Sequence, residues 1–252
     1  MKWPRFRQNP LFAFLTPKGG ENPMLPFANG LFFLVLPYLA MFVFFLGTIM
    51  RYRKAPFTYS SFSSQFLENR QHFWGLVPFH YGIVAVLIGH IVAFLIPAEI
   101  LVWNSRPLRL YILEASALAF GLLTLVGLCG AIHRRLTFAK VRAVTTTMDW
   151  IVFALLLAQV ASGVFTAVFH PWGSSWFAAA VAPYLWSLVR LNPNLAFITA
   201  MPFIVKAHII MAYALIGVAP FTRLVHILVA PNPYFWRKNQ VVRWYRSPEQ
   251  VS

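Results

Sequence analysis

Residues 79–97 read FHYGIVAVLIGHIVAFLIP, an apolar run that carries two histidines, His80 and His90, ten residues apart. A third histidine, His208, lies in another apolar run near the far end of the chain. An imidazole is costly to place at membrane depth unless something binds it, so metal ligands or proton carriers are expected here. Two ligands on one helix with partners on another helix is an arrangement that stacks haem b groups across a bilayer. The alternative is a structural histidine bonded to a neighbouring carbonyl.

The composition indicates an integral membrane protein. Of the 252 residues, 59% are hydrophobic, only 11% are charged, and 25 are phenylalanine. This excess of apolar residues is typical of proteins whose solvent is lipid. The single cysteine, Cys129, excludes an iron–sulfur cluster, a CxxCH haem attachment and an internal disulfide. Any haem is therefore expected to be held noncovalently, by histidine.

Five segments are long enough to cross about 30 Å of hydrocarbon as α-helices. They are Leu31–Met50, Val77–Pro97, Leu110–Ile132, Trp150–Phe169 and Phe197–Phe221. The sequence therefore predicts an all-α membrane protein whose five transmembrane helices form a haem-binding bundle. Residues 1–29 would be an N-terminal tail, residues 30–231 the membrane domain and residues 232–252 a cytoplasmic C-terminal tail.

The distribution of positive charge predicts the orientation. An odd number of spans places the two termini on opposite sides of the membrane, and most lysines and arginines outside the spans share a side with the C-terminus. By the positive-inside rule the C-terminus is expected in the cytoplasm and the N-terminus outside. The net charge of +15 is attributed to this pattern and to contacts with acidic head groups or partner proteins. Nucleic acid is not implied.

Two segments between the spans carry patterns of their own. Residues Tyr59–Phe73 mix apolar and polar side chains at helical spacing, which predicts an amphipathic helix at the cytoplasmic interface. The loop Pro171–Asn194 contains Trp172, Trp176, Tyr184 and Trp186. These aromatic residues are interpreted as a belt at the outer interface, with a docking or quinone-facing surface as the alternative.

The histidines predict one haem toward each leaflet. Ten residues of helix separate His80 from His90 by about 15 Å, so His80 would be the cytoplasmic ligand and His90 the outer one. Gly82 and Gly89 would let a flat porphyrin approach the backbone. In a fifth span from Phe197 to Phe221, His208 lies past the midpoint toward the cytoplasm. His80 and His208 are therefore expected to hold the inner haem.

The second ligand of an outer haem is less obvious, because residues 190–197 contain no histidine. His170, at the outer end of span four, is the first candidate, although the sequence His170-Pro171 is also an ordinary helix stop. Met201 and Asn194 are weaker candidates. The remaining histidines, His72, His133 and His226, are interpreted as peripheral, in solvent or among head groups.

Basic residues near the membrane edge are candidates to neutralise haem propionates. Arg135, Lys206 and Arg223 fit the cytoplasmic side, and Arg109 fits the outer side, where it could also serve a quinone. Each could equally be a positive-inside or snorkelling residue. Glu114 lies within span three toward the outer leaflet, where a carboxylate is expensive. It is expected to pair with Arg109 or to relay protons.

Several short motifs occur in order along the chain: SSQFL (63–67), FHYGI (79–83), GH (89–90), RRL (134–136), VRA (141–143), TTT (145–147), His208 and PFTRLVHI (220–227). This ordered set resembles one protein family, the gamma subunits of membrane-bound respiratory nitrate reductases. The likeness covers about Leu31 to Arg246, and so all five spans. It implies His80 and His208 as the inner haem pair, His90 as one outer ligand, and Arg109 near the position of a basic residue in the family's quinol pocket.

The resemblance also implies a role and partners. Members of this family are five-helix cytochromes b in the bacterial cytoplasmic membrane. They take electrons from quinol on the outer side and pass them through two haems. The electrons reach an iron–sulfur beta subunit and then a molybdenum-containing alpha subunit in the cytoplasm. The chain is thus expected to be an electron-transfer subunit of an oxidoreductase complex.

Three other interpretations remain open at this stage. The same kind of subunit in a nitrite oxidoreductase would pass electrons outward to a periplasmic cytochrome c. A structural anchor would lack haem function, or at least one haem. A proton or small-solute transporter would use His90, Glu114 and Lys206, although the sequence has no inverted repeat or pair of broken helices that would favour transport.

Overall fold

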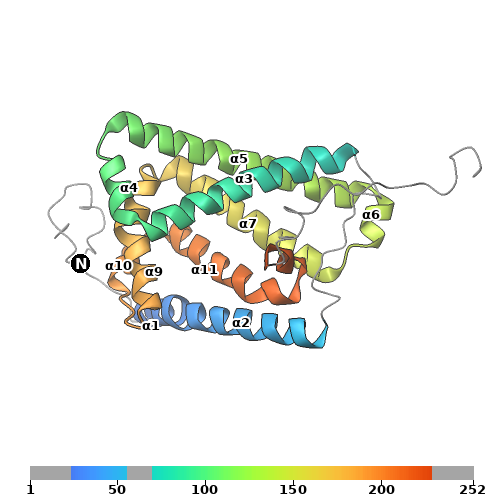
Figure 1. Ribbon diagram of the computed structural model, residues 1–252, viewed down its shortest axis with the longest axis horizontal. Coiled ribbons are helices and arrows are strands. Elements are labelled where there is room, and N and C mark those ends of the chain that lie inside the picture. Colours follow the sequence, from blue (N-terminus) through green and yellow to red (C-terminus); the bar gives the residue numbers. More distant parts are fainter. Residues whose placement is uncertain (1–23, 56–69, 229–252) are drawn as a thin grey trace, which may run out of the picture.

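The computed structural model describes residues 24–55 and 70–228, and every regular element within them is helical. Five long helices lie side by side along the long axis of the molecule (Figure 1). They comprise the run of α1 (Met24–Gly30), η3 (Leu31–Val35) and α2 (Leu36–Lys54), then α3 (Arg70–Leu95), α5 (Pro107–Thr137), α7 (Thr147–Phe169) and α11 (Phe203–Val218). Short helices at the two ends are α4 (Pro97–Trp103), α6 (Ala139–Ala143), α8 (Gly173–Trp176), η6 (Phe177–Val181), α9 (Ala182–Val189), α10 (Ala196–Thr199), η7 (Ala219–Phe221) and η8 (Arg223–Leu228).

The five long helices confirm the predicted fold class. The segments long and apolar enough to cross a membrane are Phe27–Lys54, Phe73–Leu95, Pro107–Thr137, Thr147–Phe169 and Phe203–Phe221. Large apolar side chains remain exposed along these segments, as expected when lipid rather than water surrounds the bundle. The successive helices alternate in direction along the long axis (Figure 1).

Proline and capping residues set the ends of several helices. Pro107 starts α5, because a proline at the first helical position loses no intrahelical hydrogen bond. Thr146 and Asp149 form a reciprocal capping box at the start of α7. Pro202 separates α10 from α11, so the fifth long helix begins at Phe203 and not at Phe197 as predicted. This shift of six residues changes the level at which His208 lies.

Glycines bring α3 and α5 into very close contact. A Cβ atom on Gly82 of α3 would stand 2.7 Å from the backbone nitrogen of Thr124 in α5. A Cβ atom on Gly127 of α5 would overlap the backbone nitrogen of Phe79 and stand 2.8 Å from the carbonyl oxygen of Gly75. Gly82 therefore serves helix packing rather than the approach of a porphyrin, which corrects the sequence-based expectation.

The segment predicted as the loop Pro171–Asn194 is largely helical. Its elements α8, η6 and α9 form one continuous run, Gly173–Val189, which we call the connecting helix. It lies across one end of the bundle, near α4 and α10 (Figure 1). Basic side chains including Arg51 and Arg134 lie at the opposite end, which we call the basic end.

The aromatic side chains of the connecting helix face the bundle. Tyr184 is completely buried, and its hydroxyl donates to the carbonyl oxygen of Phe33 at 2.7 Å. Burial raises the pKa of Tyr184, which keeps this donor protonated. Trp186 donates to the carbonyl oxygen of Phe94 at 2.9 Å and stacks on the Phe94 ring. A belt at the membrane interface is therefore the wrong interpretation for Tyr184, and the connecting helix is a packed part of the bundle.

Some predictions fall outside the described residues. They include both tails over residues 1–23 and 232–252, and residues 59–69 of the predicted interfacial helix. The described part of that helix, residues 70–73, belongs to α3.

Candidate functional site

Four histidines lie at two levels of the bundle: His80, His90, His208 and His226. His90 lies near the end of α3, close to the connecting helix, and His208 lies in the second turn of α11, which starts at that same end. His80 lies ten residues before His90, and so about 15 Å nearer the basic end. Ten residues also separate His208 from Val218, where α11 ends. The structure therefore places His208 level with His90 and not with His80.

His80 has a different neighbour, His226 of η8. The two ring centres are 6.3 Å apart. His80 Nδ1 lies 2.7 Å from the carbonyl oxygen of Leu76, and His226 Nδ1 lies 2.6 Å from that of Arg223. A carbonyl oxygen only accepts, so both Nδ1 atoms carry the proton and both Nε2 atoms keep a free lone pair. The sequence interpretation placed His226 at the periphery; its side chain is exposed, and its ring lies beside that of His80.

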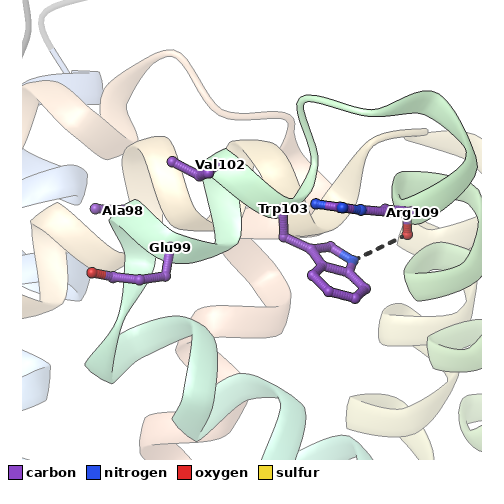
Figure 2. Close-up of a pocket in the computed structure, with 5 residues that line it drawn as sticks. All are labelled: Ala98, Glu99, Val102, Trp103 and Arg109. Carbon is purple, nitrogen blue, oxygen red and sulfur yellow. Dashed lines mark hydrogen bonds between the residues drawn. The ribbon is translucent and has the colours of Figure 1, made fainter.

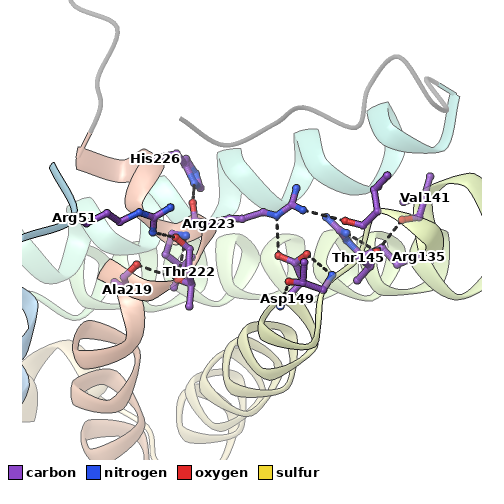
Figure 3. A network of polar contacts seen from close by, with 12 residues as sticks. Arg51, Arg135, Val141, Thr145, Asp149, Ala219, Thr222, Arg223 and His226 are labelled. Carbon is purple, nitrogen blue, oxygen red and sulfur yellow. Dashed lines mark hydrogen bonds and ion pairs between the residues drawn. The ribbon is translucent and has the colours of Figure 1, made fainter. Parts of the chain in front are cut away.

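Charged contacts hold the segment that carries His226, as Figure 3 shows. Arg51 of α2 donates to the carbonyl oxygens of Pro220 (2.6 Å) and Thr222 (2.9 Å). Arg223 forms an ion pair of 2.9 Å with Asp149, a largely buried carboxylate at the start of α7. These contacts bind η7 and η8 to α2 and α7 on both sides of residue 222. The place of His226 is thus set by side chains from distant parts of the chain.

Arg135 and Arg223 both lie at the basic end of the bundle. Arg223 also donates to the carbonyl oxygen of Val144 at 3.0 Å. Arg135 donates to the Thr145 hydroxyl at 2.8 Å and lies over the ring of Phe153. The two guanidinium groups therefore belong to the network drawn in Figure 3, around the segment that carries His226.

His90 of α3 and His208 of α11 lie at the same level of the bundle. His90 Nδ1 lies 2.8 Å from the carbonyl oxygen of Val86, and the His90 ring meets the ring of Phe177 edge to face at 5.3 Å. Gly89 stands beside open space, with no described atom within 4 Å of where its Cβ would be.

His208 is held by α7. Its Nδ1 lies 2.9 Å from the hydroxyl oxygen of Ser162, and its Nε2 lies 3.1 Å from the amide nitrogen of Gln159. The opposite Gln159 oxygen is buried and has no hydrogen-bond partner among the described residues. The Gln159 amide nitrogen therefore donates to His208 Nε2, and no second hydrogen bond to the amide oxygen holds the side chain in place.

All four histidines share a pattern typical of metal ligands. Each Nδ1 is engaged by an oxygen, which fixes the tautomer and leaves Nε2 as the ligating atom. A metal–imidazole bond of about 2 Å on each face puts two ring centres roughly 6 Å apart. The 6.3 Å between His80 and His226 fits this spacing. His80 and His226 therefore fit a bis-histidine haem, and His90 and His208 offer the same nitrogen donors at the other level.

Lys206 lies at the other end from the one predicted. It is in the first turn of α11, two residues before His208, and its Nζ donates to the carbonyl oxygen of Thr199 at 2.6 Å. The expected cytoplasmic position assumed a fifth span that starts at Phe197. With α11 starting at Phe203, Lys206 belongs to the level of His90 and His208.

Glu114 has a partner other than the predicted Arg109. One carboxylate oxygen accepts from the backbone nitrogen of Ser174 at 2.8 Å and from its hydroxyl at 2.6 Å. The Asn104 amide donates to the same hydroxyl at 2.9 Å. Glu114 thus binds the start of the connecting helix to α5 and does not pair with Arg109 as predicted.

Arg109 lines a pocket of about 250 Å³ together with Ala98, Glu99, Val102 and Trp103 (Figure 2). The guanidinium lies over the Trp103 ring, 5.0 Å from its centre. The indole nitrogen donates to the Arg109 carbonyl oxygen at 3.3 Å. This arrangement presents a cation beside an aromatic wall near the connecting helix.

The remaining candidate ligands find other surroundings. His170 lies against the ring of Phe165, with 6.5 Å between ring centres, and ligation by His170 stays a prediction. Asn194 accepts from the backbone nitrogen of Ala196, and Met201 is buried. His133 contacts the Thr137 hydroxyl within its own helix. The sequence prediction overlooked Pro202. Because α11 begins after this proline, His208 lies near the start of the helix, at the level of His90.

Comparison with known proteins agrees with the motifs. A family described as nitrate reductase gamma subunit matches residues 29–245. The respiratory nitrate reductase 2 gamma chain of Escherichia coli is 34% identical over 227 residues, which cover 87% of this chain and 99% of that one. The nitrate reductase gamma chain of Bacillus subtilis is 30% identical, over 83% of this chain and 95% of that one. The E. coli respiratory nitrate reductase 1 gamma chain is 31% identical, over 87% and 99%.

Proposed function

The chain belongs to the nitrate reductase gamma subunit family, and from this premise we propose that it is the haem b electron-transfer subunit and membrane anchor of a nitrate reductase-type complex. The observation that carries the proposal is the placement of four histidines as two pairs at two levels, with Nδ1 of each ring held by an oxygen and Nε2 left to bind a metal. A stack of two redox groups is what an electron path across a bilayer requires.

His80 and His226 would hold the haem nearer the basic end, and His90 and His208 would hold the haem at the other end. This assignment replaces the sequence-based pairing of His80 with His208 and the use of His170. Each haem would supply a one-electron carrier whose potential depends on its axial ligands and on the hydrogen bonds behind them. The protein's own part is to fix the imidazole orientations, keep Nδ1 protonated and exclude water.

The cations support this assignment. Arg135 and Arg223 are near enough to the His226 segment to neutralise propionates there, and Arg223 is one-third exposed despite its bond to Asp149. Lys206 offers the same charge at the level of His208. At the connecting-helix end, the pocket with Arg109 over Trp103 is the candidate quinone site. Glu114 contributes to that end by holding the connecting helix.

Membership of the complex implies alpha and beta partner subunits. By the positive-inside rule the basic end faces the cytoplasm, where the molybdenum-containing alpha subunit and the iron–sulfur beta subunit would bind. The haem with His80 and His226 would then exchange electrons with the iron–sulfur subunit. The quinone side would lie at the connecting helix, on the outer face of a bacterial cytoplasmic membrane.

The test is a histidine series in the assembled complex, with haem quantified per gamma chain and reduced-minus-oxidised spectra recorded. His80→Ala and His226→Ala should each lose one and the same spectral component, and His90→Ala and His208→Ala should each lose the other. His133→Ala is the matched control and should keep both. Loss of the same component from His80→Ala and His208→Ala would restore the sequence-based pairing, and a wild-type complex without haem b in this chain would overturn the function.

A further inference from the structure

We propose that Ser162 is a positioning residue for His208, which sets the donor strength of that imidazole and thereby the reduction potential of the haem at the connecting-helix end. The inference rests on the proposed function, because it takes His208 as an axial ligand. It goes further by assigning a role to a neutral side chain on a helix that carries no ligand of its own.

The hydrogen-bond directions around Ser162 are settled by its surroundings. Its hydroxyl donates to the carbonyl oxygen of Gln159, one turn back in α7, at 2.9 Å. A hydroxyl has one proton, so toward His208 Nδ1, at 2.9 Å, the same oxygen must accept. Ser162 is buried, with 6% of its surface exposed, so water does not compete for this bond. Ser162 therefore keeps the proton of His208 on Nδ1.

The neighbouring glycine fixes where the ring lies. A Cβ atom on Gly163 would stand 3.0 Å from His208 Cε1, so the imidazole rests directly on the backbone of α7. With Ser162 at one nitrogen and Gly163 beneath, the ring has a single acceptor within reach of Nδ1 in the described structure. The orientation of the imidazole thus depends on α7 and not on its own helix.

This acceptor differs in kind from those of the other three histidines. His80, His90 and His226 each donate to a backbone carbonyl three or four residues earlier, at 2.7, 2.8 and 2.6 Å. A hydroxyl oxygen is a weaker acceptor than an amide carbonyl, so it draws less on the Nδ1 proton. A less electron-rich imidazole stabilises ferric iron less, and the bond behind a ligand is one of the means by which a protein tunes haem potential.

The two haems should therefore differ in the acceptor behind one ligand, and a substitution at Ser162 should increase this difference. Taking away the acceptor altogether, in Ser162→Ala, should weaken the imidazole as a donor and favour ferrous iron further. We expect about a fivefold shift of the equilibrium toward the ferrous form, on the scale of one neutral hydrogen bond. At 59 mV per tenfold for one electron, this is about 40 mV upward.

The experiment is a redox titration of both haems in the purified complex, with low-temperature spectra and electron paramagnetic resonance of the ferric state. Ser162→Ala should raise the potential and shift the ferric signal of only the haem that His208→Ala removes. Ser162→Thr, which keeps the hydroxyl, should restore both. Ser116→Ala is the matched control, because Ser116 makes the same bond one turn back, to Leu113 at 2.9 Å, and should change neither haem.

The possible failures are distinguishable. If His208→Ala leaves both haems intact, the ligand assignment fails and this inference falls with it. If His208→Ala removes one haem but Ser162→Ala leaves its potential and ferric signal unchanged, the role of Ser162 alone is overturned. An equal change with Ser162→Thr would also overturn it, since the hydroxyl would then not be what matters.

Discussion

The two ends of the bundle hold their histidine pairs by different means. At the basic end, His226 lies on η8, a short 3₁₀ helix that Arg51 and the Arg223–Asp149 ion pair attach to α2 and α7. At the other end, His208 lies within α11 and is positioned by neutral groups of α7. A site assembled by charge can be dismantled by one substitution, whereas a site inside a packed helix should tolerate loss of a single polar group.

The largest loss of stability and haem is expected at the contact of α3 with α5, because α3 carries a histidine of each pair. Gly127→Val would force these helices apart, because even a Cβ atom would overlap the backbone of Phe79. Overpacking of this kind should cost about 3 kcal/mol of folding free energy. Because α3 carries both His80 and His90, both haems should be lost together, as measured by haem per chain and by thermal unfolding in detergent. Gly30→Ala, in open space, is the control.

A smaller effect that separates the ends is expected from Asp149→Ala. It removes the ion-pair partner of Arg223 and the capping box of α7, at a cost of roughly 3 kcal/mol or less, because Arg223 is partly exposed. The spectral component tied to His80 and His226 should weaken, while the other persists. Lys140→Ala removes a charge at the same end and should leave both. Equal loss of the two components would show that the ends are not independent.

The smallest effect is expected at the connecting helix, from Glu114→Ala. The carboxylate accepts two bonds from Ser174, so its loss should cost about 1–2 kcal/mol. Phe177, one turn further along, packs on His90. The spectrum of the haem held by His90 should therefore broaden or shift slightly without loss of haem. Asn192→Ala, which changes an exposed polar side chain at the same end, is the control. A change confined to the basic end would contradict the contact described here.

Much of the fold could be predicted from the sequence, because length and apolarity alone define a membrane span. The candidate ligands on α3 could be proposed for the same reason, since both histidines lie in one uninterrupted apolar run. The histidines opposite them, on α11 and η8, could not be paired correctly from the sequence. Met201-Pro202 interrupts an otherwise apolar segment, and a hydropathy pattern does not register one proline within it.

His226 was missed for a different reason. Its position depends on contacts between residues far apart in sequence, such as Arg51 with Pro220. A local pattern of charge beside a span predicts the membrane edge, but it does not predict which distant imidazole the chain will fold back to contact. Likewise, the aromatic residues of the connecting helix read as a surface belt because only tertiary packing reveals that Tyr184 is buried.

The glycine contact between α3 and α5 has a consequence for electron tunnelling, whose rate falls steeply with the separation of donor and acceptor. One ligand of each proposed haem lies on the same rigid helix, about 15 Å apart along its axis. Close backbone contact at Gly82 and Gly127 keeps that helix from sliding or bending away. Docking of a partner at the basic end could then displace His226 while the spacing between the two irons stays nearly constant. The rate of electron transfer between the two haems would thus change little when the partner subunits bind.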